Sequence, residues 1–380
     1  MKNNKVKKGN VVVAMSSGVD SSVAAAILKK QGYGVVGIFM HFWKEPHQSE
    51  LVENKCCSLE AQEDARKVAQ ILGIPLYTAN VAKEFKKEVV DYYLEELKKG
   101  RTPNPCVACN QHIKFNVMLK KMLEMKADYI ATGHYAQLHK FKVKSSKLKV
   151  KENIIYRLYQ GKDKEKDQSY FLFNLSQRQL SKILFPVGKY KKSEIRKMAK
   201  KFDLPVYNKD DSQGICFAPE KYPEEFIKRN LKMKKGKIID TSGKILGEHE
   251  GLPIFTIGQR RGINIGGTGP YYVVGKDSKK NELIVTNKEK DAALYRSVAL
   301  VNILNWVEIR PKMPMKALVK IRYRHPAVRA IIKLTNNKQP TTNNSSYIIE
   351  FDGPQRAVTP GQAAVFYTSR GEVLGGGIIK

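Results

Sequence analysis

The chain has 380 residues, of which 42% are hydrophobic, so it is long enough for two or three domains with cores of their own. Lysine and arginine number 68 against 36 acidic residues, which leaves a formal net charge of +32. The sequence contains no apolar run long enough for a membrane span and no apolar core of a signal peptide. We therefore expect a cytoplasmic protein with no membrane partner.

The excess of positive charge has two interpretations. Nucleic acid is one candidate partner, because lysine and arginine that neutralise its phosphates release condensed counterions. The alternative is a lysine-rich genome that makes most of its proteins basic. The charge by itself therefore favours a polyanionic partner without establishing one.

Short apolar runs alternate with amphipathic helices in the first third of the chain. Continuous apolar runs are typical of strands buried on both faces of a parallel sheet, and they predict strands over 11–15, 35–39, 74–77 and 129–132. Apolar residues at helical spacing predict helices over 58–72 and 81–98. This alternation predicts a doubly wound α/β domain with right-handed crossovers.

The rest of the chain changes character twice. A lysine-rich alternating stretch predicts a basic hairpin over 136–160, and helices are predicted near 176–184, 193–202 and 223–229. Strands and turns then dominate, with a polar hairpin tip at 336–346, which predicts a closing all-β barrel. We expect three domains: an α/β domain over 1–217, a small central α+β domain over 218–284 and a C-terminal β-barrel over 285–380.

A run of small residues, AMSSGVDSS, lies between the first strand and an alanine-rich helix, over residues 14–22. Small residues let the backbone approach a polyphosphate, and hydroxyls and helix N-terminal N–H groups donate to its oxygens. The run lacks the GK[ST] ending of a Walker A loop. It closely resembles the SGGxDS signature of PP-loop ATP pyrophosphatases, with Ser17 where glycine is usual. Asp20 is expected to hold Mg²⁺ or to orient the loop.

Five cysteines in a reducing compartment argue against a disulfide scaffold and favour catalysis, redox chemistry or metal binding. Cys106 and Cys109 form a CxxC in a proline-pinned loop before a helix expected to start near Gln111, where the helix dipole would favour a thiolate. Cys216 follows far along the chain in a GICF turn. A second CxxC, which a four-thiolate zinc site needs, is missing from the sequence, so catalysis, a cluster and redox chemistry all stay open.

Eight segments, taken together, resemble the tRNA-specific 2-thiouridylase (MnmA) family. They follow one another in this order: AMSSGVDSS, TPNPC-x-x-CN-x-x-IKF, ATGHYA, KDQSYFL, GICF, FTIGQRRG, IRYRH and PGQAAVFY. The resemblance covers nearly the whole chain, and it implies a PP-loop domain, a small central domain and a C-terminal barrel. It also implies the activity of a tRNA-uridine 2-sulfurtransferase, which converts the wobble uridine (position 34) of tRNAs for Lys, Glu and Gln into 2-thiouridine.

The resemblance further implies the ligands of the nucleotide. ATP, with Mg²⁺, would adenylate the C2 oxygen of the uracil, and AMP and pyrophosphate would be released. The residues implied to bind ATP are Ala14, Met15, Ser16, Ser17, Gly18, Val19, Asp20, Ser21, Met40 and Gly133.

Roles for the cysteines and for the tRNA contacts follow from the same resemblance. Cys216 would carry sulfur as a persulfide that comes from a cysteine desulfurase or a sulfur-relay protein. Cys109 would act as the nucleophile that helps release the sulfur, and a Cys109–Cys216 disulfide would result. The residues implied to contact the target base are Asn104, Pro105 and Cys106. Those implied to contact the tRNA are His134, Lys166, Asp167, Gln168, Arg322, Tyr323 and Gln362.

Cys106 departs from the family pattern, because many members have aspartate there as a proposed acid or base. A thiol is a poor substitute for that carboxyl at neutral pH. With Cys109 and Cys216 it makes a set of three thiols that matches the ligands of a 4Fe–4S cluster with one open iron. The persulfide and the cluster therefore stand as two hypotheses for sulfur delivery.

Other readings compete with this function. A PP-loop ligase that acts on a small molecule would explain the phosphate loop but not the cysteines or the charge. A non-catalytic RNA-binding protein would explain the charge but not two cysteines placed in loops. Among single sites, His134 fits a hydrogen-bonded core histidine as well as a tRNA contact, and Lys166–Gln168 fits a solvated charge run.

Overall fold

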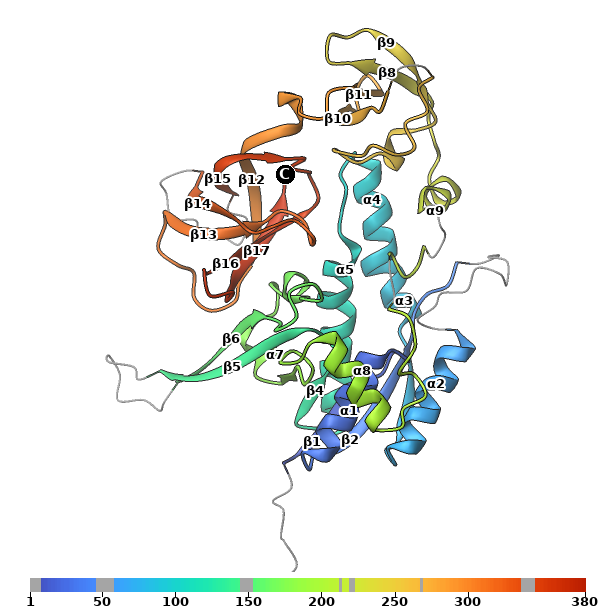
Figure 1. Cartoon of the computed structure of the whole chain (residues 1–380), viewed down its shortest axis with the longest axis vertical. Helices are drawn as coiled ribbons and strands as arrows, with labels where there is room; N and C mark the ends of the chain where they lie inside the picture. The colour runs from blue at the N-terminus through green and yellow to red at the C-terminus, as the bar shows by residue number, and fades with distance from the viewer. Residues whose placement is uncertain are drawn as a thin grey trace, which may run out of the picture.

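The computed structural model describes residues 8–45, 58–143, 153–211, 214–218, 223–266, 269–335 and 346–380. Its N-terminal part is built on a five-stranded sheet in the order β3-β2-β1-β4-β7, with every neighbouring pair parallel. The strands are β1 (Asn10–Ala14), β2 (Gly34–His41), β3 (Leu76–Asn80), β4 (Tyr129–Ala131) and β7 (Ile183–Leu184). Helices cover the sheet, so the central strand is apolar on both faces and Val11–Val13 is fully buried. The predicted doubly wound α/β domain is confirmed (Figure 1).

The helices of this domain are α1 (Val19–Lys30), α2 (Leu59–Ile71), α3 (Ala82–Phe85), η1 (Lys86–Asp91), α4 (Tyr92–Lys98), α5 (Pro105–Ala108), η2 (Cys109–Phe115), α6 (Asn116–Glu124), η3 (Ser169–Phe171), α7 (Gln177–Leu180) and α8 (Lys192–Lys201). Two long helices, α3–η1–α4 and α5–η2–α6, each contain a π-helical stretch in their middle. The helix predicted over 176–184 is shorter than expected, because Ile183 and Leu184 pair with β4 as an edge strand of the sheet.

The predicted basic hairpin is formed by β5 (Ala136–Val143) and β6 (Asn153–Gln160), which pair antiparallel along their whole length. It projects away from the body of the molecule (Figure 1). Part of its predicted span, 144–152, lies outside the described residues.

The central part is a four-stranded sheet in the order β10-β11-β8-β9. Its elements are α9 (Pro223–Asn230), β8 (Gly236–Asp240), β9 (Ile245–His249), η4 (Leu252–Ile254), β10 (Tyr272–Asp277) and β11 (Glu282–Thr286). Strand β11 pairs with β8 and β10, and it extends two residues beyond the predicted end of this domain at 284.

The C-terminal part is a closed six-stranded barrel, as predicted, in the order β12-β15-β14-β13-β16-β17. Its elements are η5 (Ala292–Leu294), β12 (Tyr295–Trp306), β13 (Met315–Lys320), β14 (Val328–Leu334), β15 (Ser346–Arg356), β16 (Ala363–Tyr367) and β17 (Val373–Ile379). The predicted polar tip at 336–346 lies outside the described residues except for Ser346. No helix within the described ranges is long and apolar enough to cross a membrane.

The barrel and the α/β domain share one hydrophobic core. Buried Tyr170 and Phe173 belong to the same cluster as Val365 and Tyr367 of β16. The Tyr170 hydroxyl donates to the Ala363 carbonyl at 2.9 Å, which ties the two domains together at a buried position. The barrel is therefore held in one place over the loop that precedes α5, and that placement matters for the site.

Candidate functional site

The phosphate loop lies where the sequence places it, between the end of β1 at Ala14 and the start of α1 at Val19. The Ser16 amide donates to Ser21 Oγ at 3.2 Å, and the Ser21 and Ser22 hydroxyls donate to the Gly18 carbonyl at 3.1 and 2.9 Å. These bonds curl the loop around the helix start. No side chain caps α1, so its first N–H groups remain available to an anion.

Ser17 has a φ of +57°, in the left-handed region that glycine occupies without cost. This explains why glycine is usual at this position of the SGGxDS signature. The serine keeps the loop conformation at the expense of backbone strain.

Gly133 and Met40 lie beside the loop at the carboxyl ends of the central strands, where open α/β sheets bind ligands. A Cβ on Gly133 would come within 2.7 Å of the backbone of Asp20 and Ser21, so the chain after β4 touches the start of α1. Met40 is buried near the end of β2. The ten residues predicted to bind ATP therefore belong to three neighbouring strand ends.

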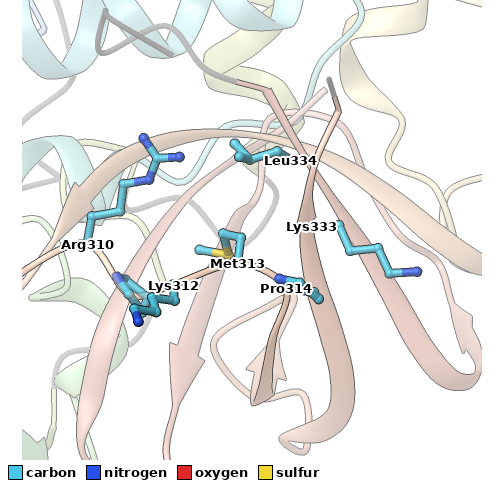
Figure 2. A pocket seen from close by; sticks show the side chains of 7 residues that line it. Arg310, Lys312, Met313, Pro314, Lys333 and Leu334 are labelled. Carbon is cyan, nitrogen blue, oxygen red and sulfur yellow. The ribbon is translucent and has the colours of Figure 1, made fainter. Parts of the chain in front are cut away.

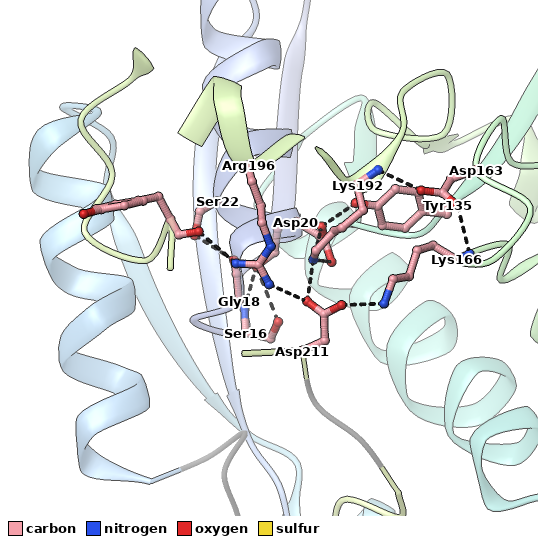
Figure 3. A network of polar contacts seen from close by, with 12 residues as sticks. Ser16, Gly18, Asp20, Ser22, Tyr135, Asp163, Lys166, Lys192, Arg196 and Asp211 are labelled. Atoms are coloured by element: carbon pink, nitrogen blue, oxygen red, sulfur yellow. Dashed lines mark hydrogen bonds and ion pairs between the residues drawn. The ribbon is translucent and has the colours of Figure 1, made fainter. Parts of the chain in front are cut away.

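Asp20 is the centre of a polar network that the sequence did not reveal (Figure 3). Its carboxylate accepts hydrogen bonds from Lys192 Nζ at 2.8 Å and from the Tyr135 hydroxyl at 2.7 Å. Lys192 stands at the first position of α8, and it also pairs with Asp211 at 2.8 Å. Nothing in a lysine-rich chain distinguishes Lys192 from its neighbours, because only the packing of α8 against α1 brings it to the loop.

A second lysine, Lys209, also reaches the phosphate loop. Its Nζ lies 2.6 Å from the Asp64 carboxylate and 3.4 Å from Ser17 Oγ. Together with Lys192 it brings positive charge to the rim of a loop that already carries helix N–H donors. This arrangement suits a polyphosphate.

Cys109 lies inside a helix, not in a loop ahead of one, and this corrects the expectation from the sequence. The helix begins at Pro105, with Pro105 in its first turn and Asn104 as its N-cap, whose Oδ1 accepts from the Cys106 amide at 3.1 Å. Proline is favoured at the first helical position because its missing N–H needs no partner there. Cys109 opens the π-helical stretch η2, a local geometry frequent at functional sites.

The environment of the two helical thiols favours their protonated forms, contrary to the dipole argument. Cys109 is 8% exposed, and burial raises the pKa of its thiol well above the usual range, although Lys114 opposes the shift. Burial, with a smaller contribution from Cys216, raises the pKa of Cys106 to about 11. Desolvation outweighs the helix dipole here because the charge would sit in an apolar surrounding.

Cys216 lies close to both helical cysteines, although it is far from them in sequence. Its charge acts on the pKa values of Cys106 and of Cys109, and its own side chain is exposed. None of the three forms a disulfide in this structure. In the described part of the chain, no three His, Cys, Asp or Glu side chains are placed to hold a single metal ion. Cys56 and Cys57 lie outside the described residues.

The three domains meet at the loop that leads to Cys106. Gln362 Nε2 of the barrel donates to the Thr102 carbonyl at 2.7 Å, and the Thr102 amide donates to the Pro360 carbonyl at 2.8 Å. Thr102 Oγ1 also lies 3.4 Å from Thr256 Oγ1 of the central domain. The segment predicted to contact the target base is therefore positioned by all three domains.

Arg322 and Tyr323 stand on the barrel side of this junction. Arg322 donates to the carbonyls of Ile257 and Ala357 at 2.8 and 2.9 Å and also to Thr359 Oγ1, so it joins the central domain to the barrel. The Tyr323 ring lies 4.5 Å from the Phe171 ring. Desolvation, followed by the charge of Asp167 and with a smaller contribution from Cys106, raises the pKa of Tyr323.

His134 is buried, and its Nδ1 lies 2.7 Å from Thr132 Oγ1. Its ring packs against the rings of Phe115 and Phe185, and desolvation, followed by the charge of Lys114, lowers its pKa well below the usual range. The imidazole is therefore neutral and hydrogen-bonded inside the protein. This is the arrangement of a core histidine, which the sequence allowed beside a tRNA contact.

The side chains of the Lys166–Gln168 segment make hydrogen bonds and an ion pair with other parts of the protein. Lys166 Nζ pairs with Asp211 at 2.7 Å, and Gln168 Oε1 accepts from the Tyr135 amide at 3.0 Å. Asp167 is buried and accepts from the Gly161 and Ser169 amides at 3.0 and 3.1 Å. These residues do not form a solvated charge run.

A separate hollow of about 790 Å³ lies on the barrel (Figure 2). It is lined by Arg310, Pro311, Lys312, Met313, Pro314, Lys333 and Leu334. None of the residues predicted to bind ATP, the target base or tRNA lines it, so the hollow is distinct from the phosphate loop and the cysteines.

The parallel sheet, the phosphate loop at its strand ends and the flanking lysines define a nucleotide-binding α/β protein with two appended β domains. Three family models match the chain in this order: a tRNA methyl transferase HUP domain over residues 9–220, a tRNA methyl transferase PRC-barrel domain over 224–287 and an aminomethyltransferase β-barrel domain over 296–379. The first model alone covers more than half of the chain.

Similar proteins make the family plain. The chain is 46% identical to a tRNA-specific 2-thiouridylase MnmA of Halothermothrix orenii, over 97% of this chain and 98% of that protein. It is 43% identical to tRNA-specific 2-thiouridylase MnmA 2 of Clostridium tetani, over 99% of each chain. The structure of the NMN synthetase from Francisella tularensis is a weaker match, with a TM-score of 0.31 and 16% identity over 55% of this chain and 68% of that one. The chain belongs to the tRNA-specific 2-thiouridylase (MnmA) family.

Proposed function

We propose that this chain is a tRNA-uridine 2-sulfurtransferase, which uses ATP to convert the wobble uridine of tRNAs for Lys, Glu and Gln into 2-thiouridine. The observation that carries the proposal is the convergence of Cys216 with Cys106 and Cys109 at the junction of all three domains. A small-molecule ligase would have no use for exposed and buried thiols gathered beside one loop. The net charge of +32 fits a polyanionic substrate.

The first step is activation of the base. The C2 oxygen of the uracil attacks the α-phosphorus of ATP, the bond to the β-phosphate oxygen breaks, and pyrophosphate leaves. Ser16–Ser21 and the N–H groups at the start of α1 bind the phosphates. Asp20 is the carboxylate of the loop that would hold the Mg²⁺ accompanying ATP, and the ion would supply charge neutralisation for the leaving group.

The second step transfers sulfur. Cys216 is exposed, so a cysteine desulfurase or a relay protein has access to it and can load it as a persulfide. The terminal sulfur attacks C2 of the adenylated base, and the C2–O bond breaks with release of AMP. The Cys109 thiolate then attacks the Cys216 sulfur, which leaves 2-thiouridine and a Cys109–Cys216 disulfide. A dithiol reductant restores both thiols for the next turnover.

The burial of Cys109 sets a condition on these reaction steps. A protonated thiol in an apolar site is a poor nucleophile. The target base is extruded from the anticodon into the junction, as enzymes that act on stacked bases require. We infer that the bound tRNA moves the loop that contains Asn104, Pro105 and Cys106, and that this movement gives Cys109 access to the base. His134, Gln362 and the Arg322–Tyr323 pair contribute indirectly, because they hold the surrounding elements in place.

The persulfide route and the cluster route differ in their need for Cys106. In the persulfide route Cys106 does not carry the sulfur that is transferred to tRNA. The rate of tRNA thiolation by Cys106→Ser should therefore stay within about tenfold of the rate of the unmodified enzyme. A cluster held by three thiols would lose a ligand and its activity. Cys109→Ser serves as the matched control, since it is inactive in both routes. Iron, labile sulfide and absorbance near 400 nm in anaerobically purified protein, lost in Cys106→Ser, would establish the cluster instead.

The function itself is tested with purified components. The enzyme, ATP, a persulfide donor and unmodified tRNA for Lys, Glu or Gln should yield 2-thiouridine, detected by mass spectrometry of the nucleosides. A tRNA with cytidine at position 34 is the control and should gain no sulfur. Pyrophosphate release stimulated by a small amine without tRNA, together with no thiolated nucleoside, would favour the ligase instead.

A further inference from the structure

The β5–β6 hairpin carries positive charge away from the body of the molecule (Figure 1). Its two strands, AQLHKFKV and NIIYRLYQ, contain Lys140, Lys142 and Arg157 and neither aspartate nor glutamate. Elsewhere many exposed lysines lie beside an acid, as Lys98 does beside Glu95 at 2.6 Å. The two strands therefore present cations without acidic residues of their own.

The antiparallel register sorts these side chains onto the two faces of the hairpin. Lys140 lies opposite Tyr156 and Lys142 lies opposite Ile154, and directly opposed residues share a face. Both lysines are exposed, and 44% of Ile154 is exposed beside them. We call these four residues the basic face, which combines two cations with an aromatic and an aliphatic side chain.

The opposite face of the hairpin is fastened to the barrel. Arg157 Nε lies 3.1 Å from Glu308 and 3.6 Å from Glu372, and the Tyr159 hydroxyl donates to Glu372 at 3.2 Å. The base of the hairpin is held as well, because Leu158 is fully buried. An isolated two-stranded hairpin is only marginally stable in water, so these contacts hold the strands in place. The basic face is thus displayed on a supported ribbon.

The ribbon starts beside the nucleotide site. Its first residue, Ala136, follows Tyr135, whose hydroxyl donates to Asp20 of the phosphate loop at 2.7 Å. A strand rises about 3.4 Å per residue, so Lys140 and Lys142 lie roughly 17 and 24 Å along the strand from Tyr135. A tRNA whose anticodon base is extruded at the domain junction would continue over that distance as a base-paired stem.

We propose that the basic face binds the phosphate backbone of a base-paired stem of tRNA, outside the anticodon loop. Charge complementarity selects a polyanion, because lysines that neutralise phosphates release condensed counterions. Proteins recognise base-paired RNA mainly through its phosphates and 2′-hydroxyls across a wide, shallow minor groove, which a projecting ribbon can reach. Backbone contacts position a substrate without reading its sequence, which suits an enzyme that accepts more than one tRNA. The inference rests on the proposed function for the identity of the RNA.

Binding of tRNA by the full chain tests the proposal without any sulfur chemistry. The double variant Lys140→Gln/Lys142→Gln should weaken binding by about tenfold at low salt. The slope of log K against log salt should become shallower by about 1.5–2, because two phosphate contacts are lost. Fluorescence anisotropy over a salt series measures both quantities. Lys140→Arg/Lys142→Arg keeps the charge and should bind within about twofold of the unmodified protein.

Arg66→Gln/Lys67→Gln is the matched control. It removes the same number of charges from two exposed positions of α2, which packs against β2 and the edge strand β3, on the side of the sheet away from β4 and the hairpin. Its salt slope should stay within about 0.5 of the slope of the unmodified protein. Both Gln variants should keep their Tm and their affinity for α,β-methylene ATP, which cannot be cleaved at the α,β bond, because the changed side chains lie outside the phosphate loop.

Backbone footprinting of the bound tRNA locates the contact. The unmodified protein should protect part of one stem, as well as the anticodon loop, from hydroxyl-radical cleavage. With Lys140→Gln/Lys142→Gln the protection of the stem should be lost while the anticodon loop stays protected. Protection lost only in the anticodon loop would overturn the placement on a stem.

Two further outcomes would overturn the proposal. Equal affinity and equal salt slope in Lys140→Gln/Lys142→Gln would show that the basic face does not bind tRNA. Unchanged tRNA binding with slower loading of Cys216 by a persulfide donor would assign the face to a protein partner instead. Either result leaves the proposed function intact, since 2-thiouridine formation decides that function. A protein that binds tRNA through the basic face and yet makes no 2-thiouridine would disprove the function and leave this inference standing.

Discussion

The nucleotide region and the thiol region of this protein are prepared for chemistry to different degrees. Around the phosphate loop, hydroxyls and helix N–H groups already surround the position expected for a polyphosphate, and Lys192 and Lys209 lie at its rim, paired with carboxylates. Around Cys109 the opposite holds, because the thiol is buried in a helix and its protonated form is favoured. Under the proposed mechanism, ATP binds the protein as it stands, whereas sulfur transfer needs a change in the surroundings of Cys109 that we expect bound tRNA to bring about.

Removal of a thiol should give the largest difference between the two regions, because it affects tRNA thiolation but hardly changes nucleotide binding. Cys109→Ser and Cys216→Ser should each lower tRNA thiolation by about a thousandfold or more, since serine neither carries a persulfide nor forms the disulfide. Binding of α,β-methylene ATP should stay within about twofold in both variants. The measurement is 2-thiouridine per tRNA by nucleoside mass spectrometry, and normal thiolation by either variant would move the chemistry to other residues.

The junction of the domains gives the next largest effect. Arg322→Ala should destabilise the fold by about 2–3 kcal/mol, because three acceptors from two domains lose their donor. Thermal unfolding should show a drop in Tm, and Arg324→Ala, an exposed neighbour, is the control. A normal Tm combined with weaker tRNA binding would instead make Arg322 a direct tRNA contact.

At pH 7, Cys216 is expected to react about tenfold or more faster than Cys109. The reason is that the thiolate fraction of a cysteine falls tenfold for each unit by which its pKa is raised. Iodoacetamide should label exposed Cys216 before buried Cys109, and the Cys109 rate should still climb above pH 9. The raised pKa values also make the stability of the fold depend on pH. The buried neutral thiols stabilise the fold fully below about pH 8.5, and this contribution is lost as the pH rises through the raised pKa values. Equal labelling rates at pH 7 would mean that Cys109 is already accessible without tRNA.

The smallest effect concerns the strained serine of the phosphate loop. Ser17→Gly should stabilise the protein by about 1 kcal/mol, because φ of +57° costs glycine nothing, while the weak 3.4 Å contact to Lys209 is lost. Chemical denaturation monitored by fluorescence measures the change, and Ser22→Gly within α1 should destabilise the protein instead. A loss of stability in Ser17→Gly would show that the serine hydroxyl matters more than the strain.

Local patterns determined much of this protein. Apolar runs predicted β1, β2 and β4 almost to the residue, because strands buried on both faces leave few alternatives for polar residues. The phosphate loop could be located for a similar reason, since strand, small residues and helix follow one another directly. The closing barrel was predictable from its strands and turns.

Only the tertiary structure decided the environment of the reactive groups. Sequence spacing placed Cys109 at a helix start with a favoured thiolate, but Pro105 and Asn104 begin the helix earlier and the surrounding core buries the thiol. Lys192 is one lysine among many until α8 packs against α1 and sets it between Asp20 and Asp211. Residue types and periodicity are local properties that a sequence carries, whereas desolvation and ion pairing depend on which distant segments the fold brings together.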